Sequence, residues 1–138
     1  LRIRTAMIRL TFSLFVILSA GSVPALAHHS FAAEYDETKP IKVTGTITKV
    51  EWTNPHVWYY VDVKGEDGKI TNYAFSAGAP GQLMRRGIMK KALEIGATIT
   101  VDGFKAKDGS TNGFGAKVTY TDGRMVFTAG QPDDPKKP

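Results

Sequence analysis

Alternation of apolar and polar residues is the feature that most limits the folds open to this chain. In the segment 57–63, valine and tyrosine occupy the odd positions, while Trp58, Tyr60 and Asp62 occupy the even ones. A period of two places successive side chains on opposite faces of a β-strand. Similar strand-like segments occur at 41–47, 69–75, 97–105 and 115–121, with a final short piece at 125–127. The sequence therefore predicts a mainly β protein.

Two local signals refine the first three strands. The apolar parity of the first strand changes between Ile47 and Val50, which predicts a β-bulge near Thr48-Lys49. Residues 65–68 predict a hairpin turn, because their Asp-Gly pair tolerates positive φ. We therefore expect the second and third strands to be antiparallel neighbours.

A helical signal separates the third and fourth strands. Pro80 suits the first turn of a helix, and apolar residues recur at three- to five-residue spacing between Gly78 and Gly96. We expect one or two short helical turns, interrupted near Gly87. Three strands, a short helix, two strands and a stub is the order of an OB-fold. The predicted fold is a small five-stranded OB-like barrel with a short helix between strands 3 and 4, and a small open β-sandwich is the alternative.

Residues 1–27 are predicted to form a cleavable secretory signal peptide. Arg2, Arg4 and Arg9 precede an apolar run from Leu10 to about Ala20. That run is shorter than the roughly 20 apolar residues of a membrane span. Small residues at the two positions that signal peptidase reads, Ala25 and Ala27, follow. We expect the mature chain to begin at residue 28, to lie in the periplasm or be secreted, and to keep no membrane span.

The remaining chain is predicted to hold one domain. Residues 28–40 form an N-terminal segment, 41–129 the barrel, and 130–138 a disordered tail rich in proline and charge. The predicted signal removes three of the 18 basic residues and none of the 13 acidic ones, so the net charge falls from +5 to +2. A nucleic-acid partner is therefore not expected. Because the chain has no cysteine, disulfides, thiol catalysis and cysteine metal sites are excluded.

The three histidines of the chain are the strongest chemical signal. His28 and His29 would open the mature chain, and His56 stands at the start of the second strand. A terminal amine and neutral imidazoles are nitrogen ligands that favour Cu(II) among first-row divalent ions. The hypothesis is a site for copper or zinc, which requires the segment after Ser30 to fold back across the barrel. The alternative is that the first two histidines are a spacer and His56 caps a turn.

A second candidate site is an aromatic face. Trp52, Trp58 and Tyr60, with Asn54, could line a ligand face on the second and third strands, where OB barrels bind. The alternative is that these rings cover the core.

Residues 108–113 resemble the first half of a calcium-binding loop. The twelfth position of such a loop needs a glutamate, and here it is Thr119, so this segment is interpreted as a connecting loop.

Two short motifs stand out in the chain, a mature N-terminal His-His-Ser-Phe at residues 28–31 and a Trp-x-Asn-Pro-His motif at 52–56. Together with the segments 83–87, 106–110 and 122–124, they resemble an uncharacterised family of small exported, periplasmic proteobacterial proteins. The resemblance implies export and a single domain, and it implies no activity.

The sequence lacks the main hydrolase, phosphate-loop and metalloprotease signatures. The leading hypothesis is a non-catalytic exported binding protein that holds copper or another divalent metal through its N-terminal histidines. The competing hypothesis is a metal-free accessory module that binds a protein or an envelope ligand through the aromatic face. A copper-dependent oxidative enzyme is the third and weakest hypothesis.

Overall fold

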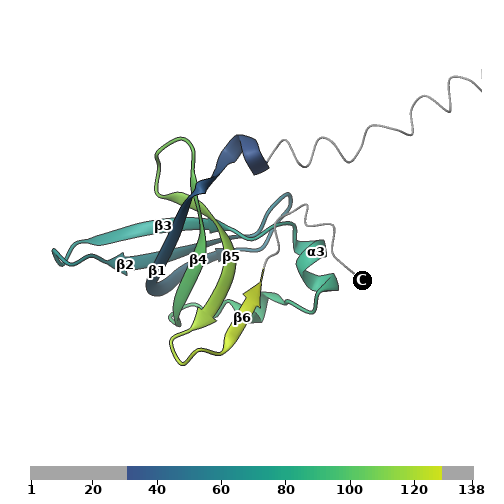
Figure 1. Ribbon diagram of the computed structural model, residues 1–138. Helices are drawn as coiled ribbons and strands as arrows, with labels where there is room; N and C mark the ends of the chain where they lie inside the picture. The colour runs from purple at the N-terminus through teal and green to yellow at the C-terminus, as the bar shows by residue number, and fades with distance from the viewer. Residues whose placement is uncertain (1–30, 129–138) are drawn as a thin grey trace, which may run out of the picture.

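The computed structural model describes residues 31–128, which form a mainly β domain (Figure 1). A helical turn at residues 31–34 precedes the first strand. The strands are β1 (Tyr35–Glu51), β2 (Trp58–Lys64), β3 (Ile70–Ser76), β4 (Thr98–Ala106), β5 (Asn112–Tyr120) and β6 (Met125–Thr128). The short helix α3 (Pro80–Arg85) and the 3-10 turn η1 (Lys90–Ala92) connect β3 to β4, as the sequence predicts.

The six strands belong to one sheet that closes on itself. Their order is β3-β2-β1-β4-β5-β6, and neighbours in this order are antiparallel. A short parallel pairing of β3 with β5, from Ala74↔Asn112 to Ser76↔Phe114, brings the arrangement round into a ring. The predicted stub at 125–127 is the edge strand β6, which pairs with β5.

β1 is long enough to pair with two neighbours. It pairs with β2 from Thr46 to Glu51 and with β4 from Tyr35 to Thr46. The predicted bulge is confirmed, because the register with β2 shifts between Ile47 and Lys49. The predicted start of this strand at Ile41 is wrong, since β1 already begins at Tyr35. Part of the predicted N-terminal segment 28–40 therefore belongs to the sheet.

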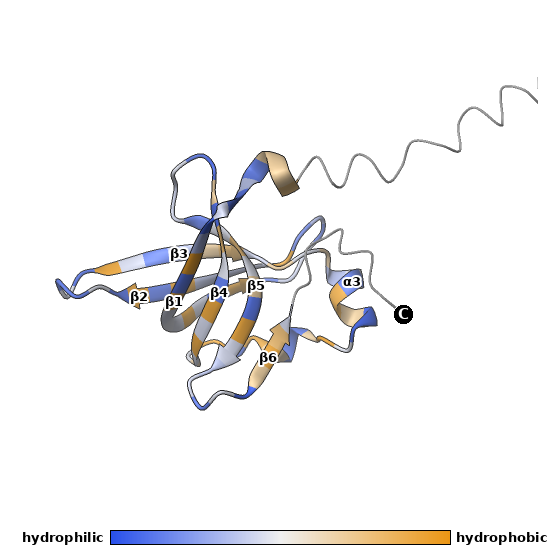
Figure 2. Cartoon of the chain, in the orientation of Figure 1, coloured by the Kyte–Doolittle hydropathy of each residue, from blue (hydrophilic) through white to orange (hydrophobic). Residues whose placement is uncertain are grey.

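The interior of the ring is filled by the apolar side of each strand. Tyr59, Phe75 and Val101 are fully buried, and apolar and polar residues alternate along the strands (Figure 2). The glycines of β5 make room for the aromatic rings. A Cβ at Gly113 would meet the Phe75 ring, and a Cβ at Gly115 would collide with the Tyr59 hydroxyl. Their lack of a side chain thus lets β5 close on the rings of β2 and β3.

The segment between β3 and β4 is held by two buried leucines. Pro80 stands in the first turn of α3, where its missing N–H is not needed, and Leu83 is buried. Gly87 ends this turn with φ +80, a conformation that favours glycine. Leu93 is the second buried leucine. No helix in the described part of the chain is long and apolar enough to span a bilayer.

Tyr59→Phe should stabilise the protein by about 1 kcal/mol, because a buried hydroxyl without a partner lowers stability. The Tyr59 hydroxyl is buried, has no hydrogen-bond partner among residues 31–128, and its pKa is raised well above its usual value by burial. Urea unfolding would measure the change. Tyr60→Phe is the matched control: its hydroxyl donates to Glu51, so no gain is expected there. If Tyr59→Phe lowered the stability, the Tyr59 hydroxyl would have to make a favourable interaction, contrary to this prediction.

Candidate functional site

One cross-strand row of residues defines an end of the ring. Trp58 of β2 pairs with Ser76 of β3, and Ser76 pairs with Phe114 of β5. Alternation along these strands puts the three side chains on the face opposite to Tyr59 and Phe75. Phe114 and Ser76 are nevertheless almost fully buried. Another segment of the chain therefore covers this part of the outer face.

The cover is supplied by the N-terminal turn and the first residue of β1. The Phe31 ring lies 5.0 Å from the Phe114 ring and 6.3 Å from the Phe104 ring, both edge-on. The Tyr35 ring lies 5.3 Å from the Phe31 ring, and the hydroxyls of Tyr35 and Ser76 are hydrogen-bonded at 2.8 Å. Burial raises the pKa of Tyr35. Both aromatic side chains are less than 8% exposed, so they anchor the start of the described chain.

A groove of about 320 Å³ runs between this cover and Trp58. Its walls carry the charges of Glu34, Lys107 and Asp108 beside the indole ring. The Lys107 ammonium donates to the carbonyl of Ala32, which ties the N-terminal turn to the end of β4. The groove is therefore lined by an aromatic ring and by side chains of both positive and negative charge.

The loop between β1 and β2 lies next to the same row. It contains the cis peptide bond Asn54-Pro55, and Asn54 is exposed. His56 is half-buried, and no described residue forms a hydrogen bond or an ion pair with its imidazole. Two hydrogen bonds fix Val57 to the residues just after β3. The Val57 N–H donates to the carbonyl of Gly78 (2.8 Å), and its carbonyl accepts from the N–H of Ala77 (3.0 Å). His56 is thus held two residues before Trp58.

The other predicted aromatic residues have different surroundings. Trp52 is half-buried and packs against the core. The Tyr60 hydroxyl donates to Glu51 at 2.8 Å, and the Lys49 ammonium lies 4.9 Å from the Tyr60 ring centre. The Glu51 hydrogen bond raises the pKa of Tyr60, while hydrogen bonds from Lys49 and then Tyr60 lower that of Glu51. Of the four predicted ligand residues, only Trp58 lines the groove described above.

The predicted metal ligands His28 and His29 lie outside the described residues. Within residues 31–128 no three His, Asp or Glu side chains are grouped so that they could hold a metal ion. A site of three such side chains that includes His56 would draw at least one of them from outside residues 31–128.

The groove residues that sequence reasoning missed come from the N-terminal turn, the loop after β4 and the start of β5, among them Ala33, Glu34, Lys107 and Asn112. A signal for the loop existed in the run 108–113, which was predicted only as a connection, and it does connect β4 to β5. No sequence signal places the N-terminal turn beside this loop. The turn packs on Phe104 and Phe114, and these two residues become neighbours only when β4 pairs with β5.

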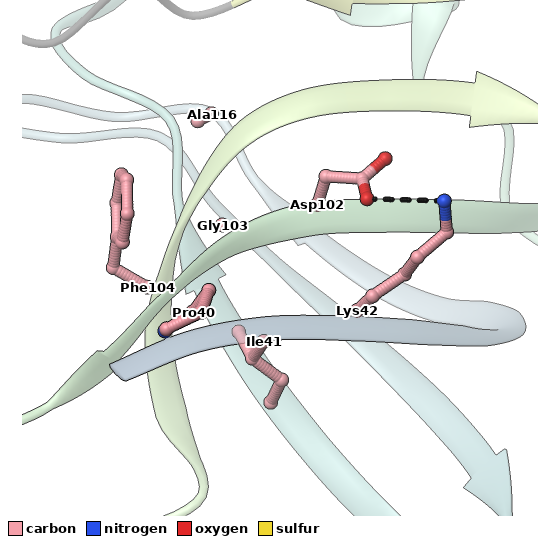
Figure 3. A pocket seen from close by; sticks show the side chains of 7 residues that line it. All are labelled: Pro40, Ile41, Lys42, Asp102, Gly103, Phe104 and Ala116. Atoms are coloured by element: carbon pink, nitrogen blue, oxygen red, sulfur yellow. Dashed lines mark ion pairs between the residues drawn. The ribbon is translucent and has the colours of Figure 1, made fainter. Parts of the chain in front are cut away.

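A second hollow lies on the β1–β4 side of the ring (Figure 3). Its walls are mostly apolar and include Ile41 and Phe104. Its two charged groups face each other, since the Lys42 ammonium lies 3.3 Å from an Asp102 carboxylate oxygen. Because these charges neutralise one another, the hollow offers less to a polar ligand than the groove beside Trp58.

The chain was compared with known protein families and with curated proteins. The model of a family described as a family of unknown function, DUF6152, matches residues 16–116. No curated protein matches the chain.

Proposed function

Because this chain belongs to DUF6152, a family of unknown function, we propose its function from the geometry of the candidate site. The protein is a non-catalytic binding protein, exported to the periplasm or secreted, that holds Cu(II) through His28, His29 and His56. Zinc is the second metal that these ligands suit. The ring of strands serves as an OB-like barrel that supports the site.

The strand pairing supports the OB-like barrel. β1 pairs with β2 and β4, β2 with β3, β4 with β5, and β3 closes the ring on β5. The short helical segment between β3 and β4 is where an OB-fold has its helix. In that fold ligands bind on strands 2 and 3 and the adjoining loops, which are here the elements around Trp58.

The position of Phe31 is the observation that carries the metal proposal. Binding by the N-terminal histidines needs the segment after Ser30 to return to the strand that follows His56. Phe31 packs on Phe114, which lies two strands from Trp58 in the cross-strand row, or about 10 Å at the usual strand spacing. The three residues from Phe31 back to His28 can span about 10 Å when extended. The anchored segment is therefore close enough for its histidines to reach the loop of His56.

The state of His56 also supports the proposal. It is the only histidine among residues 31–128, and it has no hydrogen-bonding partner there. A half-buried imidazole whose ring nitrogens have no partner among these residues is available to bind a metal ion. Two histidines and a terminal amine would complete a set of nitrogen ligands, for which Cu(II) has the highest affinity among these ions.

Titration with Cu(II) tests the proposal. The protein is prepared with His28 as its first residue and compared with a version extended by one residue and with His56→Gln. We expect affinity at least about tenfold weaker in both altered proteins, a change of about 1.4 kcal/mol. Asn54→Ala, on the same loop, is the matched control and should bind normally.

The possible results separate the parts of the proposal. Equal affinity of the extended and unextended proteins would exclude the terminal amine as a ligand. Unchanged binding by His56→Gln would exclude that side chain, and the absence of any Cu(II) binding would overturn the metal function as a whole.

The groove beside Trp58 favours a second candidate function, a metal-free module that binds a protein or an envelope ligand. An indole wall beside Glu34, Lys107 and Asp108 suits a ligand with both apolar and polar groups. This function is preferred if the native protein does not bind Cu(II) and Trp58→Ala abolishes capture of a ligand from envelope extracts.

A further inference from the structure

Residues 83–92, which begin within α3, form two five-residue units with the same order of residue types. The units are Leu-Met-Arg-Arg-Gly at 83–87 and Ile-Met-Lys-Lys-Ala at 88–92. Each unit has a branched apolar residue, a methionine, two basic residues and a small residue. We call these ten residues the basic repeat.

The first position of each unit faces the protein. Leu83 is 2% exposed, and Ile88 is half-buried and packs against the core. The backbone returns toward the ring at the unit boundary, where the N–H of Ile88 donates to the carbonyl of Leu83 at 2.9 Å. Leu93, just after the second unit, is 3% exposed. Apolar side chains at five-residue intervals, Leu83, Ile88 and Leu93, thus hold the repeat against the core.

The second, third and fourth positions of each unit face solvent. Met84 is 49% exposed and Met89 43% exposed. The four basic side chains are exposed as well, and none has an ion-pair or hydrogen-bond partner among the described residues: Arg85, Arg86, Lys90 and Lys91. The basic repeat contains no acidic residue. Figure 1 shows α3 at the margin of the strand ring.

We propose that the basic repeat docks the protein on a membrane surface that contains anionic phospholipids. The four basic side chains complement a layer of phosphate groups, and each positive charge near such a surface strengthens binding by about fivefold. The exposed methionines add flexible apolar side chains that can enter the boundary between headgroups and acyl chains. Contact is peripheral, through side chains of a surface segment.

The proposal is independent of the metal function. None of the ten residues lines the groove beside Trp58, and none is a proposed metal ligand. The experiments on the two can therefore fail separately.

Co-sedimentation with vesicles tests the docking surface. The chain beginning at His28 is mixed with vesicles of phosphatidylcholine alone or of phosphatidylcholine with phosphatidylglycerol. We expect binding only to the second kind, weakening as sodium chloride rises. Replacing all four basic residues of the repeat with glutamine should lower the affinity at least about a hundredfold, and Met84→Ser with Met89→Ser at least about threefold.

A variant with the same loss of net charge elsewhere is the matched control. It replaces four exposed lysines of the strands and turns with glutamine: Lys64, Lys69, Lys105 and Lys117. Its affinity should fall much less than that of the repeat variant. Equal losses in the two variants would overturn the proposal in favour of attraction by net charge.

Other outcomes would also overturn the lipid surface as the partner. They are equal binding to both kinds of vesicle, no binding to either, and binding of the repeat to soluble polyglutamate but not to vesicles. The last result would assign the basic repeat to an acidic protein. Circular dichroism of each variant confirms that it is folded.

Discussion

Gly115→Ala is expected to destabilise the protein by about 3 kcal/mol, at the upper end for overpacking of a closed core. The added Cβ would collide with the hydroxyl of Tyr59 and would also press on a Val101 methyl at 3.4 Å. Tyr59 is fully buried, and its ring stacks on Phe75 at 5.7 Å, so it has little room to move. Thermal and urea unfolding would measure the loss.

The cause can be isolated by combining the substitution with Tyr59→Phe. Without the hydroxyl, the new Cβ would meet the ring carbon at 3.0 Å, which is tight but no longer a collision with oxygen. The loss caused by Gly115→Ala should therefore be at least about 1 kcal/mol smaller in the Tyr59→Phe background.

Gly81→Ala is the control for glycine replacement in general. Gly81 is exposed in α3, and a Cβ there would meet only the end of the Arg85 side chain at 3.5 Å. This change should stabilise the protein slightly, because alanine loses less backbone entropy in a helix.

The double variant decides whether the Tyr59 hydroxyl is the cause. If the effects of Gly115→Ala and Tyr59→Phe on stability were additive, the proposed collision between the new Cβ and that hydroxyl would be wrong.

Phe31→Ala should have the second large effect, on stability and on metal binding together. Removing a buried phenylalanine side chain costs about 3 kcal/mol or more, and Phe31 contacts three aromatic rings while only 7% exposed. The substitution would release the turn at 31–34 from Phe114. If the proposed site is correct, Cu(II) affinity should fall at least about tenfold, since the histidines would lose their anchor.

Phe127→Ala distinguishes an anchoring role from a general loss of stability. Phe127 is 2% exposed in β6 and contacts Tyr59 at 6.0 Å between ring centres. Its replacement should lower stability to a similar degree but leave Cu(II) affinity unchanged under conditions where the protein stays folded. Equal losses of affinity in both variants would remove the support for anchoring by Phe31.

Much of the strand order follows from local sequence signals. The parity change near Thr48 is a bulge in the structure, the turn at 65–68 joins β2 to β3, and Gly87 follows the C-cap of α3. These features depend on neighbours in sequence. The start of β1 could not be found in this way, because the residues after Tyr35 are charged or polar up to Pro40. Tyr35 and Asp36 are in the sheet because β4 offers them partners.

The candidate site was less accessible to sequence reasoning. Trp58 was predicted as a ligand residue, but the groove beside it needs the N-terminal turn, whose position depends on rings from β4 and β5. From the alternation of residues along β5 alone, the Phe114 side chain is predicted to point outward and to be exposed. Its burial follows from the cover by Phe31, a contact between residues far apart in the chain.

The short pairing of β3 with β5 has a consequence for the rest of β3. The two strands are joined only from Ala74 to Ser76, so among the described residues the outer edge of β3 from Ile70 to Tyr73 has no strand beside it. An open edge can template pairing with another chain. Ile70 is 66% exposed there, and charged residues at the adjacent hairpin tip surround it: Lys64, Glu66, Asp67 and Lys69. The hydration of these charges opposes stacking of one molecule on the next.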